Sequence, residues 1–322
     1  MSNLLDEASH EHVALDYAGA KGLSKLLKNL SGAAAIGAYL WTVSDEGRRL
    51  ECLIADGQGY RLHSQFKLDA LFDHIAPGKE CDLEDIAIEH GRLWLLGSHC
   101  DVRLESHDKH RISPRMRQRL SRNFLGSIAL ERDGSAPKGA GIAIAAKGKG
   151  SLRRAFRGDA YLDPFLRLPS KENGLDIEGC ALLGERMLLG LRGPVLDSHA
   201  IVLDLACRSV LPVTRRRPRR HFLDLGGFGV RGLTRHGASL LVLAGPVTAA
   251  PGAFRIHRWR PGAPDRVQKP DIVHEFPIAP DKPEGLCVLR RGDRDGLLIV
   301  YDGSNKARRD GTRYLADWYA FA

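Results

Sequence analysis

The 322-residue sequence has no apolar run near the roughly 20 residues that a membrane-spanning helix needs. Residues 1–17 have neither a basic start nor an apolar core, so we expect no secretory signal there. The six cysteines are scattered along the chain, without a C-x-x-C pair or a compact disulfide framework. In a chain of this length, such cysteines are expected to be reduced, mostly buried thiols of a cytoplasmic protein.

Several local signatures of known chemistry are also missing. The sequence contains no G-x-S-x-G elbow, which leaves an α/β-hydrolase without support. The G-x-G-x-x-G at residues 227–232 is followed by a strand pattern instead of a helix, so we reject a dinucleotide site. His10 and His12 have no cysteine or carboxylate at a suitable sequence spacing, and surface positions are expected for them.

What the sequence does have is an excess of basic residues: 48 lysines and arginines against 39 acidic residues, with a net charge of +9. This excess suits acidic partners such as phosphorylated molecules, nucleic acid or anionic membranes. The strongest run of arginines lacks the interleaved aromatic residues of a nucleic-acid site. We therefore expect a small acidic or phosphorylated ligand, or a protein partner, with no membrane contact and with nucleic acid disfavoured.

One pattern recurs along the chain: a short strand, a polar turn and a second strand. Five copies align, and their equivalent early positions are Ser31, Glu84, Glu178, Arg231 and Glu284. These positions are separated by 53, 94, 53 and 53 residues, and further strand-like runs lie between the copies. About four strands per unit of about 50 residues is the size of a propeller blade. The sequence therefore predicts an all-β fold, a β-propeller that forms a single domain over residues 1–322.

The long step of 94 residues decides how many blades are expected. Its excess over the regular step is shorter than a blade, so we favour five blades with an insertion in the second, and six blades is the alternative. The insertion is placed at about residues 101–124, which are Arg-rich and compatible with a helix, and a second short helix is expected at about residues 151–162. Strand-like segments at residues 12–17 and 314–321 are expected to share one blade, because an open ring would leave a strand edge exposed.

In a propeller blade, the start of the innermost strand and the end of the next strand lie on the same face of the disc. The aligned copies therefore gather two rings of side chains at one mouth of the central channel. The first ring holds the five early positions, and the second holds Asp45, Ser98, Arg192, Gly245 and Asp302. The ligand site expected at this mouth consists of Asp45, Ser98, His99, Arg192, Arg231 and Asp302.

Three glutamates of the first ring, Glu84, Glu178 and Glu284, are candidate metal ligands. Like charges at such close range raise one another's pKa unless a cation or an arginine offsets them. Calcium, which takes about 6–8 oxygen ligands, fits this group, and another divalent cation is the alternative. Each glutamate could instead accept hydrogen bonds from the backbone of the neighbouring blade and tie the blades together. The two roles are compatible.

The sequence Lys-Glu-Asn-Gly-Leu-Asp-Ile-Glu-Gly at residues 171–179, followed by Leu-Arg-Gly-Pro-Val at 191–195, resembles an uncharacterised bacterial family, domain of unknown function 3616. The resemblance extends from about Leu30 onwards and implies a propeller-like fold without an established activity. A looser similarity, through the Glu-Gly pairs at 178–179 and 284–285, is to esterase-like phytases and calcium-activated nucleotidases. It implies calcium and phosphate esters, although Ser31 and Arg231 replace the acid that a symmetric central calcium site would need.

Two functions remain open at this point. The favoured one is a cytoplasmic propeller that binds a small ligand or a partner at the channel mouth without catalysis. The alternative is a calcium-dependent or other metal-dependent phosphoester hydrolase that uses the same carboxylates, with Arg192 and Arg231 on the phosphate. No nucleophile–base pair can be named, so no catalytic residue is assigned.

Overall fold

The computed structural model describes residues 4–108, 110–208, 211–212, 214, 216–278, 281–303 and 305–322. Within these residues the only α-helices are three short ones, α1 (Leu23–Leu26), α2 (Leu68–Leu71) and α3 (Leu152–Phe156). None of the described helices has the length and apolar character to span a bilayer. Strands make up nearly all of the regular structure, and the predicted all-β class is confirmed.

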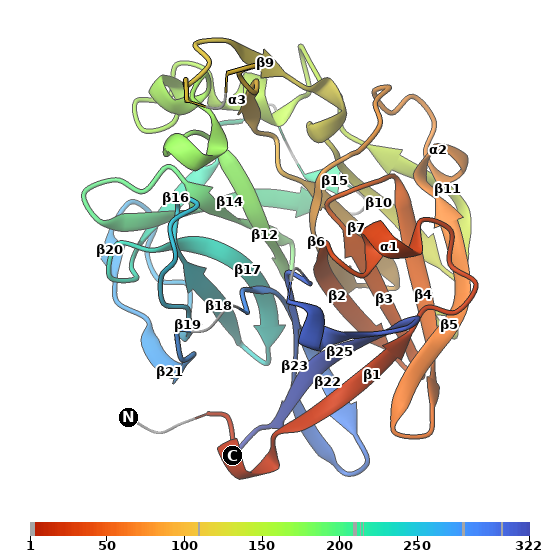
Figure 1. Ribbon diagram of the computed structural model, residues 1–322. Coiled ribbons are helices and arrows are strands. Elements are labelled where there is room, and N and C mark those ends of the chain that lie inside the picture. Colours follow the sequence, from red (N-terminus) through yellow and green to blue (C-terminus); the bar gives the residue numbers. More distant parts are fainter. Residues whose placement is uncertain are drawn as a thin grey trace.

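The strands of the first three blades pair in sequence order from the axis outwards (Figure 1). The first blade consists of β2 (Leu30–Ile36), β3 (Tyr39–Ser44), β4 (Arg49–Asp56) and β5 (Gly59–Lys67). The second consists of β6 (Leu83–Glu89), β7 (Arg92–Gly97), β10 (Leu125–Leu130) and β11 (Pro137–Ala143). The third consists of β12 (Asp176–Leu183), β13 (Arg186–Gly193), β14 (His199–Arg208) and β16 (Arg219–Asp224), with the two-residue strands β15 (Leu211–Pro212) and β20 (Val267–Gln268) at its edge.

Two further blades complete the arrangement. The next one consists of β17 (Gly229–His236), β18 (Ser239–Gly245), β19 (Arg255–Trp259) and β21 (Asp271–Glu275). The last consists of β22 (Pro283–Arg291), β23 (Arg294–Tyr301), β25 (Arg313–Ala320) and β1 (Glu11–Asp16), with β24 (Arg309–Asp310) paired to β25. The inner strands β2, β6, β12, β17 and β22 each contact the next, and β22 contacts β2. This ring of inner strands defines a β-propeller, as the sequence predicts.

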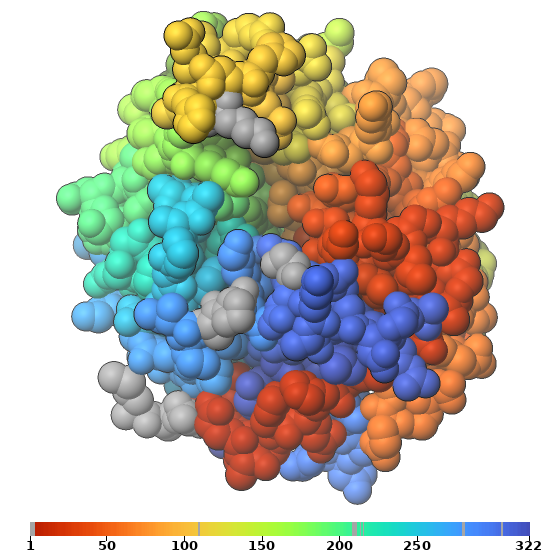
Figure 2. Space-filling model, in the orientation of Figure 1, coloured from red at the N-terminus to blue at the C-terminus, as the bar shows by residue number. Residues whose placement is uncertain are grey.

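The first and last strands of the chain close the ring. β1 pairs antiparallel with β25, so that His12 lies opposite Asp317, and it pairs in parallel with β5 of the first blade. Figure 1 shows β1 beside β25, and in Figure 2 the red amino-terminal segment lies against the blue carboxy-terminal one. The prediction that both ends of the chain share one blade is confirmed. The pairing covers a strand edge that would otherwise be free to join another chain.

The insertion between β7 and β10 is present, but the prediction of a helix at residues 101–124 is wrong. Its described residues form two short paired strands, β8 (Asp101–Arg103) and β9 (Met116–Gln118), and the 3-10 turn η2 (Leu120–Arg122), while position 109 lies outside the described part. The arginines at 115, 117 and 119 alternate with the two-residue period of a strand. The helix expected at about 151–162 is α3, which Ser151 caps by accepting from the N–H of Arg154.

The apolar core consists of five clusters, one between each pair of neighbouring blades. β18 shows how one strand supplies two clusters. Leu240 and Val242 pack toward the third blade, whereas Leu241 and Leu243 pack toward the fifth. Because successive side chains of a strand point to opposite faces and both faces are buried here, the strand is apolar throughout instead of alternating. All six cysteines are buried and free, as expected.

Candidate functional site

Every inner strand carries a β-bulge at the same place near its start. The pairing register slips there by one residue, and the slipped residues are Ser31, Glu84, Glu178, Arg231 and Glu284. A bulged residue has no partner on the neighbouring strand, and its side chain is aimed away from the regular pleat. All five line one cavity of about 430 Å³ at the mouth of the channel. The structure therefore brings the first predicted ring together, and the bulges explain how.

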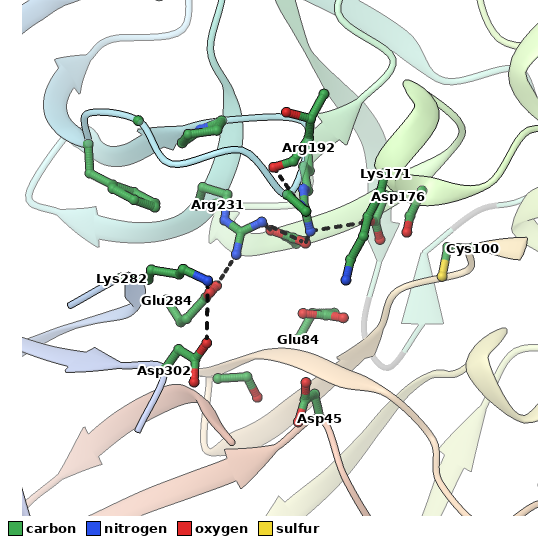
Figure 3. A pocket seen from close by; sticks show the side chains of 18 of the residues that line it. Asp45, Glu84, Cys100, Lys171, Asp176, Arg192, Arg231, Lys282, Glu284 and Asp302 are labelled. Carbon is green, nitrogen blue, oxygen red and sulfur yellow. Dashed lines mark hydrogen bonds and ion pairs between the residues drawn. The ribbon is translucent and has the colours of Figure 1, made fainter. Parts of the chain in front are cut away.

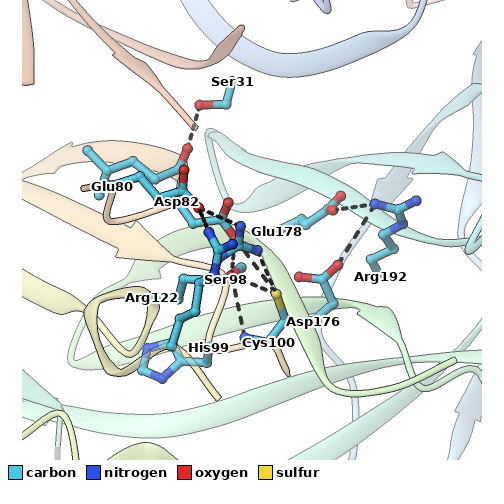
Figure 4. Close-up of polar contacts among 12 residues, drawn as sticks. Ser31, Glu80, Asp82, Ser98, His99, Cys100, Arg122, Asp176, Glu178 and Arg192 are labelled. Carbon is cyan, nitrogen blue, oxygen red and sulfur yellow. Dashed lines mark hydrogen bonds and ion pairs between the residues drawn. The ribbon is translucent and has the colours of Figure 1, made fainter. Parts of the chain in front are cut away.

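The second predicted ring reaches this cavity only in part. Asp45, Arg192 and Asp302 line it, whereas Ser98 and His99 are fully buried outside it. The ring of His99 points away from the other labelled side chains (Figure 4), and burial lowers the pKa of His99 to about 3, so the imidazole is neutral. Ser98 donates to Asp82 and supports the wall of the cavity. At the fourth position Gly245 adds no side chain.

A third ring lies two residues before the first, and sequence reasoning missed it. Its members in the cavity wall are Asn29, Asp82, Asp176 and Lys282. The signal was present as Asp-x-Glu at residues 82–84 and 176–178, because side chains two apart on a strand share a face. The cavity is also lined by Cys100, Arg122 and Lys171, which come from the segments that flank the second and third blades. These segments lie outside the repeat, so the repeat could not indicate their positions.

Two arginines occupy one side of the cavity and are held by its glutamates (Figure 3). Arg192 Nη1 donates to Glu178 Oε1 at 3.0 Å, and its Nε donates to the carbonyl of Val247 at 2.9 Å. Arg231 Nη1 lies 2.9 Å from Glu178 Oε2, and its Nη2 donates to Glu284. Both guanidinium groups are therefore engaged by the protein, and Glu284 is paired with an arginine instead of facing the other acids.

The opposite side of the cavity holds a second buried ion pair (Figure 4). Arg122 Nη1 lies 2.7 Å from Asp82 Oδ2, and its Nη2 lies 2.7 Å from Glu80 Oε1. The same Nη1 lies 3.1 Å from the Sγ atom of Cys100, whose pKa burial raises well above its usual value. Cys100 is therefore a neutral thiol and not an activated nucleophile.

Between these pairs lie the carboxyl groups of Glu84, Asp45 and Asp176. Asp176 Oδ2 is 3.8 Å from Arg192 Nη1, whereas Glu84 and Asp45 have no ion pair with a described residue. Glu84 forms no hydrogen bond or ion pair with any residue that the structure describes, and in Figure 3 no dashed line reaches Glu84 or Asp45. Asp45 Oδ1 and Asp176 Oδ1 are buried without a hydrogen-bond partner among the described residues. Burial, followed by the charge of Asp82, raises the pKa of Asp45 to about 8 and the pKa of Glu84 well above its usual value.

Three of the acidic side chains are placed to share a cation. Glu84, Asp176 and Glu178 each offer an oxygen, and these oxygens lie within 4.8 Å of one another. A set made only of carboxylate oxygens suits a hard divalent ion such as calcium. The buried, unpartnered Oδ1 of Asp176 is the observation that supports such a fit, since a buried polar atom normally has a partner. This group contains Asp176, whereas the sequence prediction named Glu284, whose carboxylate pairs with Arg231.

The contacts with the backbone of the neighbouring blade that were expected of the glutamates are made by Ser31, the ring residue of the first copy, and by Asp85. Ser31 Oγ donates to the carbonyl of Leu83 at 2.6 Å, which joins β2 to β6. Asp85, one residue after Glu84, accepts from the N–H of Cys180 at 2.7 Å and joins β6 to β12. Of the ring glutamates, Glu178 and Glu284 pair with arginines, and Glu84 faces the cavity without such a pair.

These features define a β-propeller with a charged cavity at the mouth of its axis. The chain belongs to the family described as protein of unknown function (DUF3616), whose model matches residues 29–317, so the resemblance seen in the sequence is confirmed. No curated protein matches the sequence.

Similar solved structures include three enzymes. An exo-β-1,3-galactanase from Phanerochaete chrysosporium shares 9% identity and a TM-score of 0.47, with 97% of this chain and 64% of that chain covered. RS223-β-xylosidase shares 10% identity and a TM-score of 0.49, with coverage of 92% and 93%. The glutaminyl cyclase of Myxococcus xanthus shares 8% identity and a TM-score of 0.46, with coverage of 97% of both chains. This chain spans less than two thirds of the galactanase, and these likenesses are too distant to transfer an activity.

Proposed function

We propose that this protein binds a divalent cation of the calcium class at the mouth of its channel and, through it, a small anionic ligand. The observation that carries the proposal is the convergence of Glu84, Asp176 and Glu178 in a cavity where buried carboxylate oxygens lack partners. The β-bulges of β6 and β12 hold Glu84 and Glu178 in place, so the group belongs to the rigid inner ring and not to a mobile loop.

The charge around this group requires that its carboxyl groups be neutralised, either by protons or by a cation. Arg192 and Arg231 offset Glu178 and Glu284, whereas Glu84 and Asp45 face other acids. A buried carboxylate without a counter-charge is costly, so each of these groups either holds a proton or shares a cation. A divalent ion would replace those protons and would accept the unpartnered Oδ1 of Asp176 as a ligand.

The ligand is expected to be small and anionic. The cavity of about 430 Å³ lies within the usual range of small-molecule sites, roughly 300–1,000 Å³. The arginines already donate to glutamates and backbone carbonyls, which leaves fewer of their N–H groups free for a phosphate. The cation itself and the exposed Lys171 in the cavity lining are positive groups open to an anion, and the exposed Lys282 lies 3.9 Å from Asp302 Oδ2.

Calcium titration by calorimetry tests the proposal directly. We expect about one calcium ion per chain, with an observed binding enthalpy that varies linearly with the ionisation enthalpy of the buffer, because the carboxyl groups must lose protons on binding. Glu84→Gln and Asp176→Asn are each expected to weaken binding at least tenfold. Glu51→Gln is the control, since Glu51 is as buried as Asp176 but lies in β4, outside the cavity, beside Gln65. Absence of binding, or equal binding by Glu84→Gln and the control, would overturn the proposal.

A metal-dependent phosphoester hydrolase is the second candidate, and one observation favours it. The pKa of Asp45, raised to about 8, keeps this carboxyl protonated at neutral pH beside the acidic group, where it could protonate a leaving oxygen. Turnover of phosphate esters that EDTA abolishes and Asp45→Asn reduces would support catalysis. Calcium binding without any turnover would leave the binding function alone. A cytoplasmic location stays a prediction, with which six buried, free cysteines are compatible.

A further inference from the structure

A second cluster of metal-ligating side chains lies far from the cavity, where the two ends of the chain meet. His10 caps the short 3-10 helix η1 (Glu7–Ser9), His12 is in β1, and Asp317 is opposite His12 in β25. His12 Nδ1 lies 2.7 Å from Asp317 Oδ1, and His10 Nε2 lies 3.1 Å from the same oxygen. The carboxylate that the sequence could not supply is therefore brought in from 305 residues away.

The three groups have the chemistry of a transition-metal site. Two imidazole nitrogens and one carboxylate oxygen lie within 4.8 Å of one another. A tetrahedral ion with bonds of about 2.0 Å separates its ligand atoms by about 3.3 Å, which is close to the observed spacing. Nitrogen ligands favour zinc and its neighbours over calcium or magnesium.

The surroundings of Asp317 leave one carboxylate oxygen directed at the histidines. Its Oδ2 lies 2.8 Å from Arg308 Nη2, and Arg308 is also paired with Asp281 at 2.9 Å. Burial would raise the pKa of Asp317, but the hydrogen bond and charge of Arg308 prevail and lower it to about 2, so the group is a carboxylate at neutral pH. Asp281 offsets the charge of Arg308, which reduces its repulsion of an incoming cation.

We propose that His10, His12 and Asp317 form a site for a divalent transition metal of the zinc class, and that the ion clips the amino-terminal strand to the carboxy-terminal one. The side chains of His10 and His12 are 37% and 58% exposed, which gives the ion a path in and leaves room for water as a further ligand. Because β1 is the strand that closes the ring, the ion adds a direct bond across the closure.

Zinc and cobalt titrations of the full chain test this site. We expect one zinc ion per chain and the visible absorption of tetrahedral Co²⁺ with imidazole ligands. With zinc at about a hundred times its Kd, Tm is expected to rise by roughly 5 °C. His10→Ala and His12→Ala should each remove the cobalt absorption and the rise in Tm.

His63→Ala is the matched control, because His63 is an exposed strand histidine in β5 and belongs to neither candidate metal group. It is expected to keep full zinc binding. Asp317→Asn is less useful, since loss of the Arg308 pair could unfold the blade. Zinc binding that survives both histidine substitutions would overturn the proposal, and its loss in Glu84→Gln would assign the ion to the channel mouth instead. Failure of calcium binding at the mouth would leave this site unaffected.

Discussion

The carboxyl group of Asp85 accepts a hydrogen bond from the backbone N–H of Cys180 at 2.7 Å. Its other oxygen accepts from the N–H of Ile86 at 2.8 Å, so one buried side chain connects the inner strands of the second and third blades. Asp85 occupies the position that is glycine in the other four copies of the repeat, next to the ring residue. Two adjacent residues of β6 thus have different roles: Glu84 faces the cavity, and Asp85 connects the inner strands of neighbouring blades.

Replacing Asp85 by alanine is therefore expected to destabilise the protein without removing the cation site. Two buried backbone N–H groups would lose their acceptor, at about 1–3 kcal/mol each. Urea unfolding should show a loss of roughly 3 kcal/mol, while Asp85→Asn, which keeps one acceptor oxygen, should lose less. Calcium affinity of Asp85→Asn is expected to match the wild type, and a large loss of affinity would contradict the division of roles.

The buried arginine of β17 provides a second prediction. Arg231→Met would leave Glu178 and Glu284 buried without one of their cations, and we expect a loss of about 3–5 kcal/mol. Adding Glu284→Gln should restore part of it. Arg235→Met, on the same strand but in a half-exposed pair with Glu89, is expected to cost at most about 1 kcal/mol. Equal losses from the two arginine variants would contradict the assigned burial of the Arg231 pairs.

The raised carboxyl pKa values predict how stability changes with pH when no cation is present. The pKa of Asp45 and the pKa of Asp85 are each raised to about 8, first by burial, from 3.8 in the unfolded chain. The folded state therefore holds more protons up to about pH 8, and the free energy of unfolding falls as pH rises through that value. Between pH 7 and 8.5 we expect a fall on the order of 2 kcal/mol in urea unfolding with EDTA.

Substitution of Asp45 or Asp85 tests whether these carboxyl groups cause the fall in the free energy of unfolding with pH. Asp45→Asn and Asp85→Asn remove a titrating group each, and both should flatten the dependence. Above pH 7 the buried His99, whose pKa is lowered to about 3, contributes little, because histidine is then neutral in the unfolded chain as well. A stability that is constant or rises over this range would show that the carboxyl groups are already ionised in the folded protein.

Gly285, which follows the ring residue Glu284, is required by the close approach of β22 and β2. A Cβ atom on Gly285 would lie 2.8 Å from the carbonyl oxygen of Ser31 and 2.9 Å from Gly32 Cα, where β22 meets β2. Gly285→Ala is therefore expected to cost about 1–3 kcal/mol in urea unfolding. Gly232→Ala is the comparison, since its nearest atom, the carbonyl oxygen of Glu284, would be 3.3 Å away. A smaller cost is expected there, and the reverse order would contradict this account.

Much of the cavity wall could be predicted from the sequence, because the strands and turns of each propeller blade are specified by one short stretch of chain. The spacing of Glu178, Arg231 and Glu284 by 53 residues, on strands of matching pattern, was enough to place them at one mouth. The Asp-x-Glu pattern would also have indicated Asp82 and Asp176, had the two-residue period been applied to the positions before the ring.

Only the tertiary structure decided which of these groups are paired. Arg122 comes from the insertion, where no repeat fixes its place, and its approach to Asp82 leaves Glu84 without a counter-charge. The direction of His99 depends on local backbone geometry, with a φ of 56°, which strand periodicity does not describe. Likewise, the pairing of β1 with β25 brings Asp317 to His12, although 305 residues separate them.

The sequence by itself thus determined the fold and the face on which polar groups gather, because side-chain alternation and repeat spacing act over a few residues or one blade. The charge state and the partners of those groups were decided by burial and by contacts between distant segments. Pairing energies between charges depend on separations of a few ångströms and on access to water, and neither is specified until the ring has closed.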